Sequence, residues 1–203
     1  MSRWYFVVDV GIRRWIELMI VNGSRMRRLF LTVVLIGVVG VCPACATLDE
    51  QAVVVTPTLT VFSQWAVEAE ASSQFGFPDW SVNRAVGAPE IQACKDDSRA
   101  WSSARGSGVE WLRLTYARPV YATEVRVYQS FGRGAISRVS LIDTEGNTQQ
   151  IWSGTDALDP CPGVLAVPVA QTPYRVVSVL VDLDESRMGF WNQIDAVELI
   201  GVR

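Results

Sequence analysis

The sequence predicts an all-β protein, a β-sandwich of about eight antiparallel strands. Segments in which apolar and polar residues alternate on a period of two recur through residues 64–203, and turn signals separate them. No convincing helical stretch lies among these segments. Of the 203 residues, 49% are apolar, which is enough for one ordinary domain with a sizeable core and an extension.

The predicted strands follow one another at close spacing. The clearest spans residues 109–116, where two leucines lie on one face and Arg113 and Thr115 on the other, as in a half-buried antiparallel strand. The others are residues 66–71, 122–129, 136–143, 148–152, 164–169, 174–183 and 193–200. A Glu-Gly-Asn turn at residues 145–147 joins the strands on either side of it into a hairpin.

Charge and composition exclude several classes of function. The formal net charge is −3, and lysine and arginine are scattered rather than striped, so we expect no nucleic-acid partner. Histidine is absent. This absence removes the commonest general base, the usual partner of a serine or cysteine nucleophile, and the commonest transition-metal ligand.

Residues 1–46 have the features of an export leader and are left out of the predicted fold. Residues 26–28 end in two arginines, and residues 29–41 are an apolar run of signal-peptide length, shorter than the ~20 residues that span a membrane. We interpret residues 26–46 as a signal peptide or a lipoprotein-type leader. Residues 1–25 are interpreted as an over-extended N-terminus that precedes the true start of translation.

Two ways of processing this leader fit the sequence. Ala44 and Ala46 match the small-x-small pattern of an ordinary cleavage site, which places the mature start at Thr47. Cutting and acylation at Cys42 or Cys45 is the alternative, as in a bacterial lipoprotein. Either route predicts an exported protein, at the cell surface, in the cell envelope or secreted, that meets the membrane only through its signal or lipid anchor.

The folded domain is predicted to span residues 64–203, after residues 47–63, whose four threonines and one proline suggest an extended linker. An edge strand at residues 53–55 is the alternative within that linker. Cys94 and Cys161 are the only cysteines beyond the leader. Because disulfides persist in exported proteins, we predict that these two cysteines are bonded to each other.

Several short segments, in their order along the chain, carry a resemblance to a known family. They are Ala71-Ser72-Ser73-Gln74, Trp80-Ser81, Ala85-Val86-Gly87-Ala88-Pro89, Ala100-Trp101-Ser102-Ser103, Glu110-Trp111-Leu112 and Ile194-Asp195-Ala196-Val197-Glu198-Leu199. From about Trp65 to Gly201, the chain resembles the discoidin, or coagulation-factor type C, group of the galactose-binding-like fold. The resemblance implies an eight-stranded jelly roll that binds sugars, phospholipid headgroups or proteins through the loops of one end.

The same resemblance implies a structural calcium ion as a cofactor. Many members of the family hold calcium with loop carbonyls and carboxylates, including a glutamate on the last strand. Glu198 matches that glutamate, and Asp96 and Asp97 lie in the loop that supplies the other ligands. The resemblance therefore makes Asp96, Asp97 and Glu198 the candidate metal ligands.

Two loops and one tryptophan are candidates for ligand contact. Residues 129–135 form a glycine-rich loop without the lysine and helix that phosphate binding needs, so Phe131 and Arg133 are either ligand contacts or parts of a solvated turn. Trp101 is either a platform for a sugar ring or a packed core residue.

The loop before the last strand has the same two interpretations. Met188 and Phe190 have the character of a loop tip that contacts a ligand, and Trp191 that of a core residue. We expect all of these contacts to come from one end of the sandwich.

The favoured function is a non-catalytic binding module with a carbohydrate ligand. Protein adhesion, or a structural role, is the alternative. A glycoside hydrolase that pairs Asp96 with Glu110, or Asp182 with Asp184, is less favoured. Without histidine, a lone sandwich with shallow loops has few ways to run acid–base chemistry at neutral pH.

Overall fold

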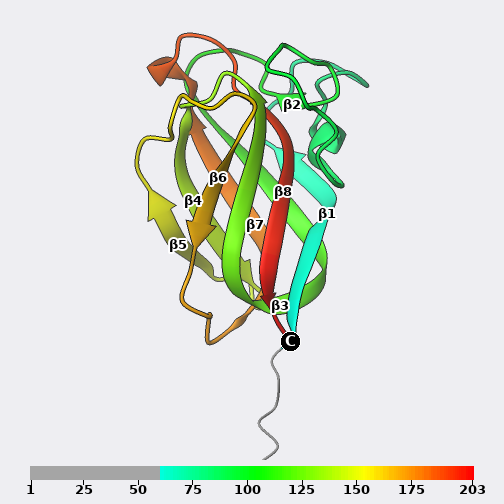
Figure 1. The fold of residues 1–203 in the computed structure, drawn as a ribbon, viewed down its shortest axis with the longest axis vertical. Helices are drawn as coiled ribbons and strands as arrows, with labels where there is room; N and C mark the ends of the chain where they lie inside the picture. Colours follow the sequence, from blue (N-terminus) through cyan, green and yellow to red (C-terminus); the bar gives the residue numbers. More distant parts are fainter. Residues whose placement is uncertain (1–59) are drawn as a thin grey trace, which may run out of the picture. The chain divides into compact units, whose positions relative to one another are not determined.

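The computed structural model describes residues 60–203, which form an antiparallel β-sandwich (Figure 1). Its elements are β1 (Val61–Ala71), the 3-10 helix η1 (Val82–Ala85), β2 (Trp101–Ser102), β3 (Val109–Phe131), β4 (Ile136–Asp143), β5 (Thr148–Ser153), β6 (Gly163–Pro168), β7 (Arg175–Asp184), the 3-10 helix η2 (Glu185–Arg187) and β8 (Gln193–Val202). The predicted fold class, an all-β sandwich of eight antiparallel strands, is confirmed. The predicted leader, and the linker up to residue 59, lie outside the described residues.

One strand, β3, belongs to both layers of the sandwich. It is 23 residues long, pairing first with β1 and β7 and then with β8 and β6. The register against β7 shifts between Thr115 and Val120, on either side of Pro119, which has no backbone N–H to donate. Two separate strands, 109–116 and 122–129, were the wrong prediction here, because the chain bends at this shift and continues instead of turning back.

β1 closes the sandwich in the same way. Residues 61–65 pair with β8, and residues 66–71 pair with the first part of β3. The strand begins at Val61, three residues inside the predicted linker. Val61 lies opposite Val202, so both ends of the described chain meet at one pole, away from the long loops (Figure 1).

The core consists of the inward side chains of both layers. Leu112 and Leu114 of β3, with Val179 and Val181 of β7, have no exposed surface. Burying such a side chain contributes roughly 1.5–3 kcal/mol, so the alternating pattern that predicts these strands also accounts for their stability. Every residue of β8 is buried. The loop at residues 90–91 bonds to Asp195, and side chains of β1 and β3 contact Glu198.

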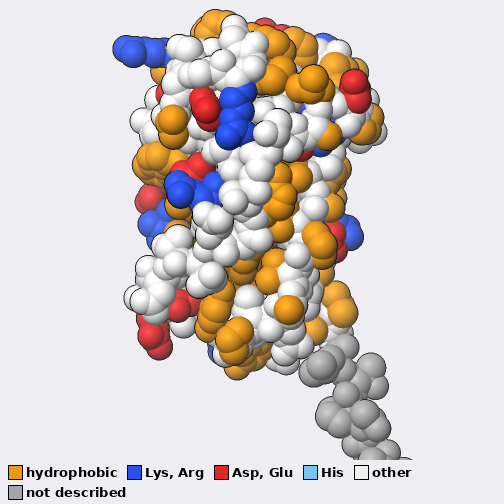
Figure 2. Space-filling view, turned by 90° about the vertical axis from the view of Figure 1, so that its left-hand side faces the viewer, with side chains coloured by type: hydrophobic (Ala, Val, Ile, Leu, Met, Phe, Trp, Pro, Cys, Tyr) orange, Lys and Arg blue, Asp and Glu red, His pale blue; other side chains and the backbone are white. Residues whose placement is uncertain are grey.

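Long loops gather at the end of the sandwich that carries β2 (Figure 1). On the face in Figure 2, basic side chains are interspersed with acidic ones, and hydrophobic side chains lie both at the upper end and over the lower half. Within residues 60–203, no helix is long and apolar enough to cross a membrane.

The predicted disulfide is confirmed. Cys94 and Cys161 are bonded, with their Cα atoms 5.1 Å apart. The bond joins the loop that follows η1 to the loop that precedes β6, and it closes 67 residues of chain. Two loops that cover the same side of β3 and β8 are therefore linked covalently.

Replacing both Cys94 and Cys161 with serine is expected to lower the free energy of unfolding by about 4 kcal/mol, because the unfolded chain regains the entropy of an open 67-residue loop. Urea denaturation of the oxidised protein and of the double variant measures this loss. The double variant should then be insensitive to a reducing agent, and equal stability of the two proteins would contradict the prediction.

Candidate functional site

A pocket of about 180 Å³ opens at the loop end, where β2, the end of β3 and the start of β8 meet. Its lining combines aromatic rings with polar side chains. The lining residues are Phe75, Trp80, Asp96, Ser102, Phe131, Trp191 and Gln193. Four of them are aromatic, which makes this aromatic pocket the main candidate for ligand binding.

The rings of the aromatic pocket hold one another in place. Phe75 meets Trp80 and Trp191 edge to face, with ring centroids 5.4 Å and 5.6 Å apart. Phe75 is 51% exposed and Trp191 38% exposed. Exposed aromatic rings in fixed orientations offer apolar surface to a ligand at little cost in conformational entropy.

Asp96 and Gln193 provide the polar side of the pocket. Asp96 Oδ1 accepts hydrogen bonds from Trp80 Nε1 at 3.0 Å and from Gln193 Nε2 at 2.5 Å. Gln193 Oε1 accepts a further bond from the backbone N–H of Asp97, at 3.0 Å. Trp80 has a φ of 52°, a left-handed conformation that costs a non-glycine residue energy and that clusters at functional sites.

A chain of buried polar side chains supports the pocket from below. Asn192 donates to Gln129 at 2.7 Å, Gln129 donates to Asp156 at 2.7 Å, and Arg133 pairs with Asp156 at 3.1 Å. Asn192 and Arg133 also donate to the backbone carbonyls of Gly132 and Pro160, respectively. These bonds join three loops, and two of the pocket's rings, Phe131 and Trp191, lie next to them in sequence.

The structure places Arg133 and Trp101 in the interior rather than on a ligand surface. Arg133 is 4% exposed and is held by Asp156, so it is neither a ligand contact nor part of a solvated turn. Trp101 has no exposed surface, and its indole N–H donates to the backbone carbonyl of Ser73 at 3.1 Å. Of its two predicted roles, Trp101 has the packing role.

The other predicted contacts divide between the pocket and the core. Phe131 lines the aromatic pocket, and its ring lies 6.1 Å from that of Phe190, which is 40% exposed. Met188 is half-buried against the core, beside Gly134. Trp191 is exposed and lines the pocket, so its assignment to the core was wrong.

Sequence reasoning missed Phe75 and Gln193 and used Trp80 only for the family resemblance. One signal could have found the first of these: residues 75–80 place three aromatic residues around a glycine and a proline, a composition typical of a loop rather than of a buried strand. No signal of this kind marks Gln193, whose role depends on the loop that crosses the start of β8.

The three candidate calcium ligands do not lie together. Asp96 contacts Gln193, whereas Glu198 lies five residues further along β8, about 16 Å of strand away. Glu198 accepts from Ser63 and Tyr128 and pairs with Arg126. Residues 60–203 contain no group of three or more carboxylate or cysteine side chains placed to hold a metal ion. These three residues therefore do not fit one calcium site, and calcium binding itself stays a prediction.

Asp97 has a local partner of its own. Arg99 donates to both of its carboxylate oxygens, at 2.9 Å and 2.8 Å, and Lys95 lies 3.3 Å away. The hydrogen bonds from Arg99 hold the pKa of Asp97 well below its usual range, although burial opposes this shift. Asp97 thus fixes the loop that carries Asp96.

The carboxylates considered for hydrolysis are also engaged by other groups. Glu110 accepts from Ser72 and Ser73, whereas Asp96 belongs to the aromatic pocket. Asp182 pairs with Arg138 at 2.8 Å, and Asp184 with Arg187 at 3.4 Å. Neither pair flanks the aromatic pocket.

Glu185 is a buried acid beneath the loop that carries Phe190 and Trp191. It has no exposed surface, its Oε1 accepts from Ser103 at 3.0 Å, and its Oε2 has no partner within residues 60–203. Burial raises the pKa of Glu185 to about 7, against the hydrogen bond from Ser103, which lowers it. The loop that carries Phe190 and Trp191 therefore packs on a carboxyl group that changes charge near neutral pH.

Fold and site together define the class of this protein: a galactose-binding-like β-sandwich with an aromatic pocket among the loops of one end. Residues 57–203 match the model of the family described as Pappalysin-1, SD scarf domain, C-terminal. The chain belongs to this family. A comparison with curated proteins found no match.

Solved structures with the same fold include three carbohydrate-binding modules. The CBM32 of AlyQ, in complex with 4,5-unsaturated mannuronic acid, has a TM-score of 0.51 and 16% identity, covering 68% of this chain and 97% of that one. CpGH89CBM32-5 from Clostridium perfringens, in complex with GalNAc-beta-1,3-galactose, has a TM-score of 0.51 and 11% identity, covering 65% and 93%. Chitosan-binding module 1 from a chitosanase/glucanase of Paenibacillus sp. IK-5, as a selenomethionine-labelled mutant, has a TM-score of 0.51 and 15% identity, covering 66% and 93%. At such identities the similarity establishes the fold.

Replacing Gly132 with alanine is expected to disrupt the aromatic pocket. The new Cβ would lie 2.0 Å from the carbonyl oxygen of Trp191, and Gly132 has a φ of +61°. Gly146 has a φ of +88° with nothing within 4 Å of a Cβ, so Gly146→Ala carries the backbone cost alone. In urea denaturation, Gly132→Ala should lose at least about 2 kcal/mol more than Gly146→Ala. Equal losses of unfolding free energy in the two variants would contradict this prediction, because they would show that the loop around Trp191 moves aside at no cost.

The pKa of Glu185 makes stability depend on pH. The pKa of Glu185 is 4.5 in the unfolded chain and about 7 in the folded one. The protonated carboxyl group therefore contributes to the free energy of unfolding in full below pH 4.5, and this contribution is lost as the pH rises through 7. The expected loss between about pH 5 and about pH 8 is roughly 2.5 kcal/mol. Glu185→Gln, which keeps an acceptor for Ser103, should remove this dependence when urea denaturation is compared at both pH values. An unchanged pH dependence in the variant would contradict the assignment.

Proposed function

We propose that residues 60–203 are a non-catalytic module that binds a carbohydrate in the aromatic pocket. One observation supports this most: two exposed rings, Phe75 and Trp191, share a pocket of about 180 Å³ with the polar side chains of Asp96 and Gln193. Sugar rings have apolar C–H patches that pack on aromatic faces, and their hydroxyl groups pair with carboxylates and amides. The pocket offers both kinds of surface side by side.

The composition of the pocket favours binding over hydrolysis. Glycoside hydrolysis requires two carboxyl groups on opposite sides of the scissile bond. Asp96 is the one carboxylate among the described residues that line the aromatic pocket, and Trp80 and Gln193 already donate to it. The ligands bound in the similar modules, such as GalNAc-beta-1,3-galactose, agree with a sugar as the ligand here.

Export belongs to the same proposal. The apolar run at residues 29–41 after a basic segment is typical of a signal peptide, and the Cys94–Cys161 disulfide suits an oxidising compartment. The module then acts in the cell envelope, at the cell surface or as a secreted protein. A signal or lipid anchor is its proposed link to a membrane.

Phe75→Ala and Trp191→Ala are the variants that test the site. A glycan array with the full-length chain identifies the sugar, and calorimetric titration then measures its affinity. Each substitution should weaken binding about tenfold or more, because it removes a ring on which the sugar packs. Both rings are exposed, so the melting temperature should change little.

Phe77→Ala is the matched control. Phe77 is 77% exposed and lies in the same loop as Phe75, but it does not line the pocket, so its removal should leave the affinity unchanged. If Phe75→Ala binds like the wild type, the sugar does not occupy this pocket. An array without any bound glycan would favour the alternative of a protein ligand.

A further inference from the structure

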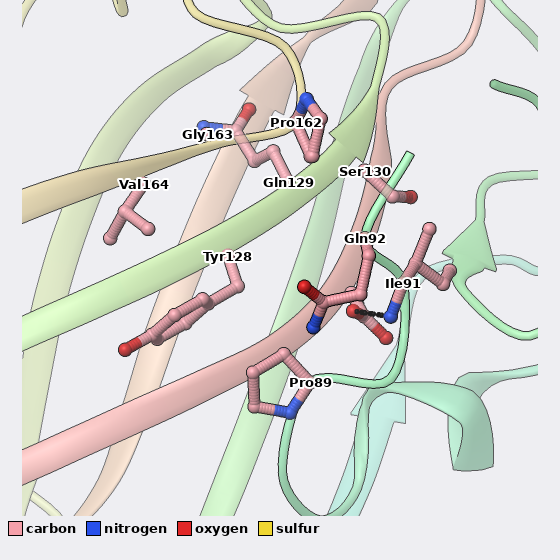
Figure 3. Close-up of a pocket in the computed structure, with 10 residues that line it drawn as sticks. Pro89, Ile91, Gln92, Tyr128, Gln129, Ser130, Pro162, Gly163 and Val164 are labelled. Atoms are coloured by element: carbon pink, nitrogen blue, oxygen red, sulfur yellow. Dashed lines mark hydrogen bonds between the residues drawn. The ribbon is translucent and has the colours of Figure 1, made fainter. Parts of the chain in front are cut away.

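A second pocket, of about 200 Å³, lies on the outer side of β3 and β8, and Figure 3 shows it. Its walls are the loop at residues 89–92 and the start of β6, and its floor is formed by residues 128–130 of β3 together with Asp195 of β8. It shares no lining residue with the aromatic pocket. This flank pocket is therefore a separate concavity with its own chemistry.

The first wall is fixed to the floor by Asp195. Asp195 is 3% exposed, and its Oδ2 accepts hydrogen bonds from the backbone N–H groups of Glu90, at 3.0 Å, and Ile91, at 2.9 Å (dashed line in Figure 3). Two bonds to one carboxylate oxygen hold the loop at a set distance from β8. The wall is preformed rather than left to close on a ligand.

The second wall is fixed through its backbone. Gly163 lies so close to the buried Arg133 that a Cβ there would meet Nη1 of that arginine at 2.2 Å and the carbonyl oxygen of Pro160 at 2.3 Å. The Cys94–Cys161 disulfide ties the two walls to each other near this point. The spacing between the walls is thus set by covalent and buried contacts.

The chemistry of the flank pocket suits hydroxyl groups. Tyr128, Pro89 and Val164 give it apolar sides, and the side-chain amide of Gln92 projects between Pro89 and Tyr128 (Figure 3). The hydrogen bonds that Asp195 makes within residues 60–203 end on Oδ2, which leaves Oδ1 to accept from a ligand. The residues that line the pocket include no lysine or arginine. The carboxylate of Asp195 would therefore repel an anionic ligand, and no basic side chain in the lining would offset this repulsion.

We propose that the flank pocket is a second binding site, which takes a small neutral molecule rich in hydroxyl groups, the size of one sugar ring. Hydroxyl groups can donate to Asp195 and accept from the Gln92 amide in the same pose. A single ring fits because the volume, about 200 Å³, is below the 300 Å³ or more of pockets for larger ligands. This inference rests on the flank pocket alone and does not require a ligand in the aromatic pocket.

Saturation-transfer NMR on the full-length chain tests the proposal, with galactose and N-acetylglucosamine as neutral probes and glucuronic acid as the anionic one. The double variant Phe75→Ala, Trp191→Ala removes the aromatic pocket. Val164→Trp is then added to fill the flank pocket from an exposed position on β6. Val109→Trp is the matched control, because Val109 is 76% exposed and lines neither pocket.

A neutral sugar is expected to bind the double variant, and Val164→Trp should weaken that binding about tenfold or more, whereas Val109→Trp should not. Glucuronic acid should bind less well than either neutral sugar. The proposal is overturned if the double variant binds neither neutral sugar at unchanged melting temperature, or if Val164→Trp binds like Val109→Trp. Wild-type binding that is insensitive to Phe75→Ala and Trp191→Ala but sensitive to Val164→Trp would reject the aromatic pocket and support the flank pocket.

Discussion

The loop end of this domain depends on one buried ion pair, between Arg133 and Asp156, whose side chains are 3% and 1% exposed. Taking two charges out of water costs several kcal/mol per ion, and only good geometry and further hydrogen bonds offset that cost. Here the offset comes from Gln129, Asn192 and the carbonyl of Pro160. Gln129 lies at the end of β3, and Asn192 and Pro160 lie in two loops. The contacts that stabilise the ion pair therefore also hold the loops that shape the aromatic pocket. Arg133 also lies against Gly163 in a wall of the flank pocket, so the aromatic pocket and the flank pocket both depend on this ion pair.

β3 explains why the loops come together at all. Because β3 pairs first with strands of one layer and then with strands of the other, the strands of the two layers run along the same direction. The loops that connect them therefore lie at the same two ends of the sandwich. The end of β3 carries Phe131 and continues directly into Gly132 and Arg133. The register shift around Pro119 thus marks where β3 passes from one layer to the other before it reaches the aromatic pocket.

The fold could be predicted from the sequence because its signal is local. Leu112 and Leu114 alternate with Arg113 whatever the rest of the chain does, and the period of two reports directly which side is buried. The site depends on residues far apart in sequence. An arginine in a loop is expected at the surface, and only the fold shows that Asp156 lies beside Arg133 and buries it. A tryptophan is expected in the core, and only the fold shows that Trp191 is exposed and packs against Phe75. Phe131 lines the aromatic pocket, and the glycine-rich loop that marked it as a candidate contact is a local signal that needs no distant partner.

The pairing of Val61 with Val202 has a mechanical consequence. Tension applied between the two ends of the described chain would peel β1 from β8 one residue pair at a time, so each hydrogen bond would carry the whole load in turn. A pull between one end and a ligand held at the opposite pole would run lengthwise along the strands, and many backbone hydrogen bonds would share it. A tethered copy that grips an immobile ligand would thus be loaded in the direction in which the sandwich resists rupture best.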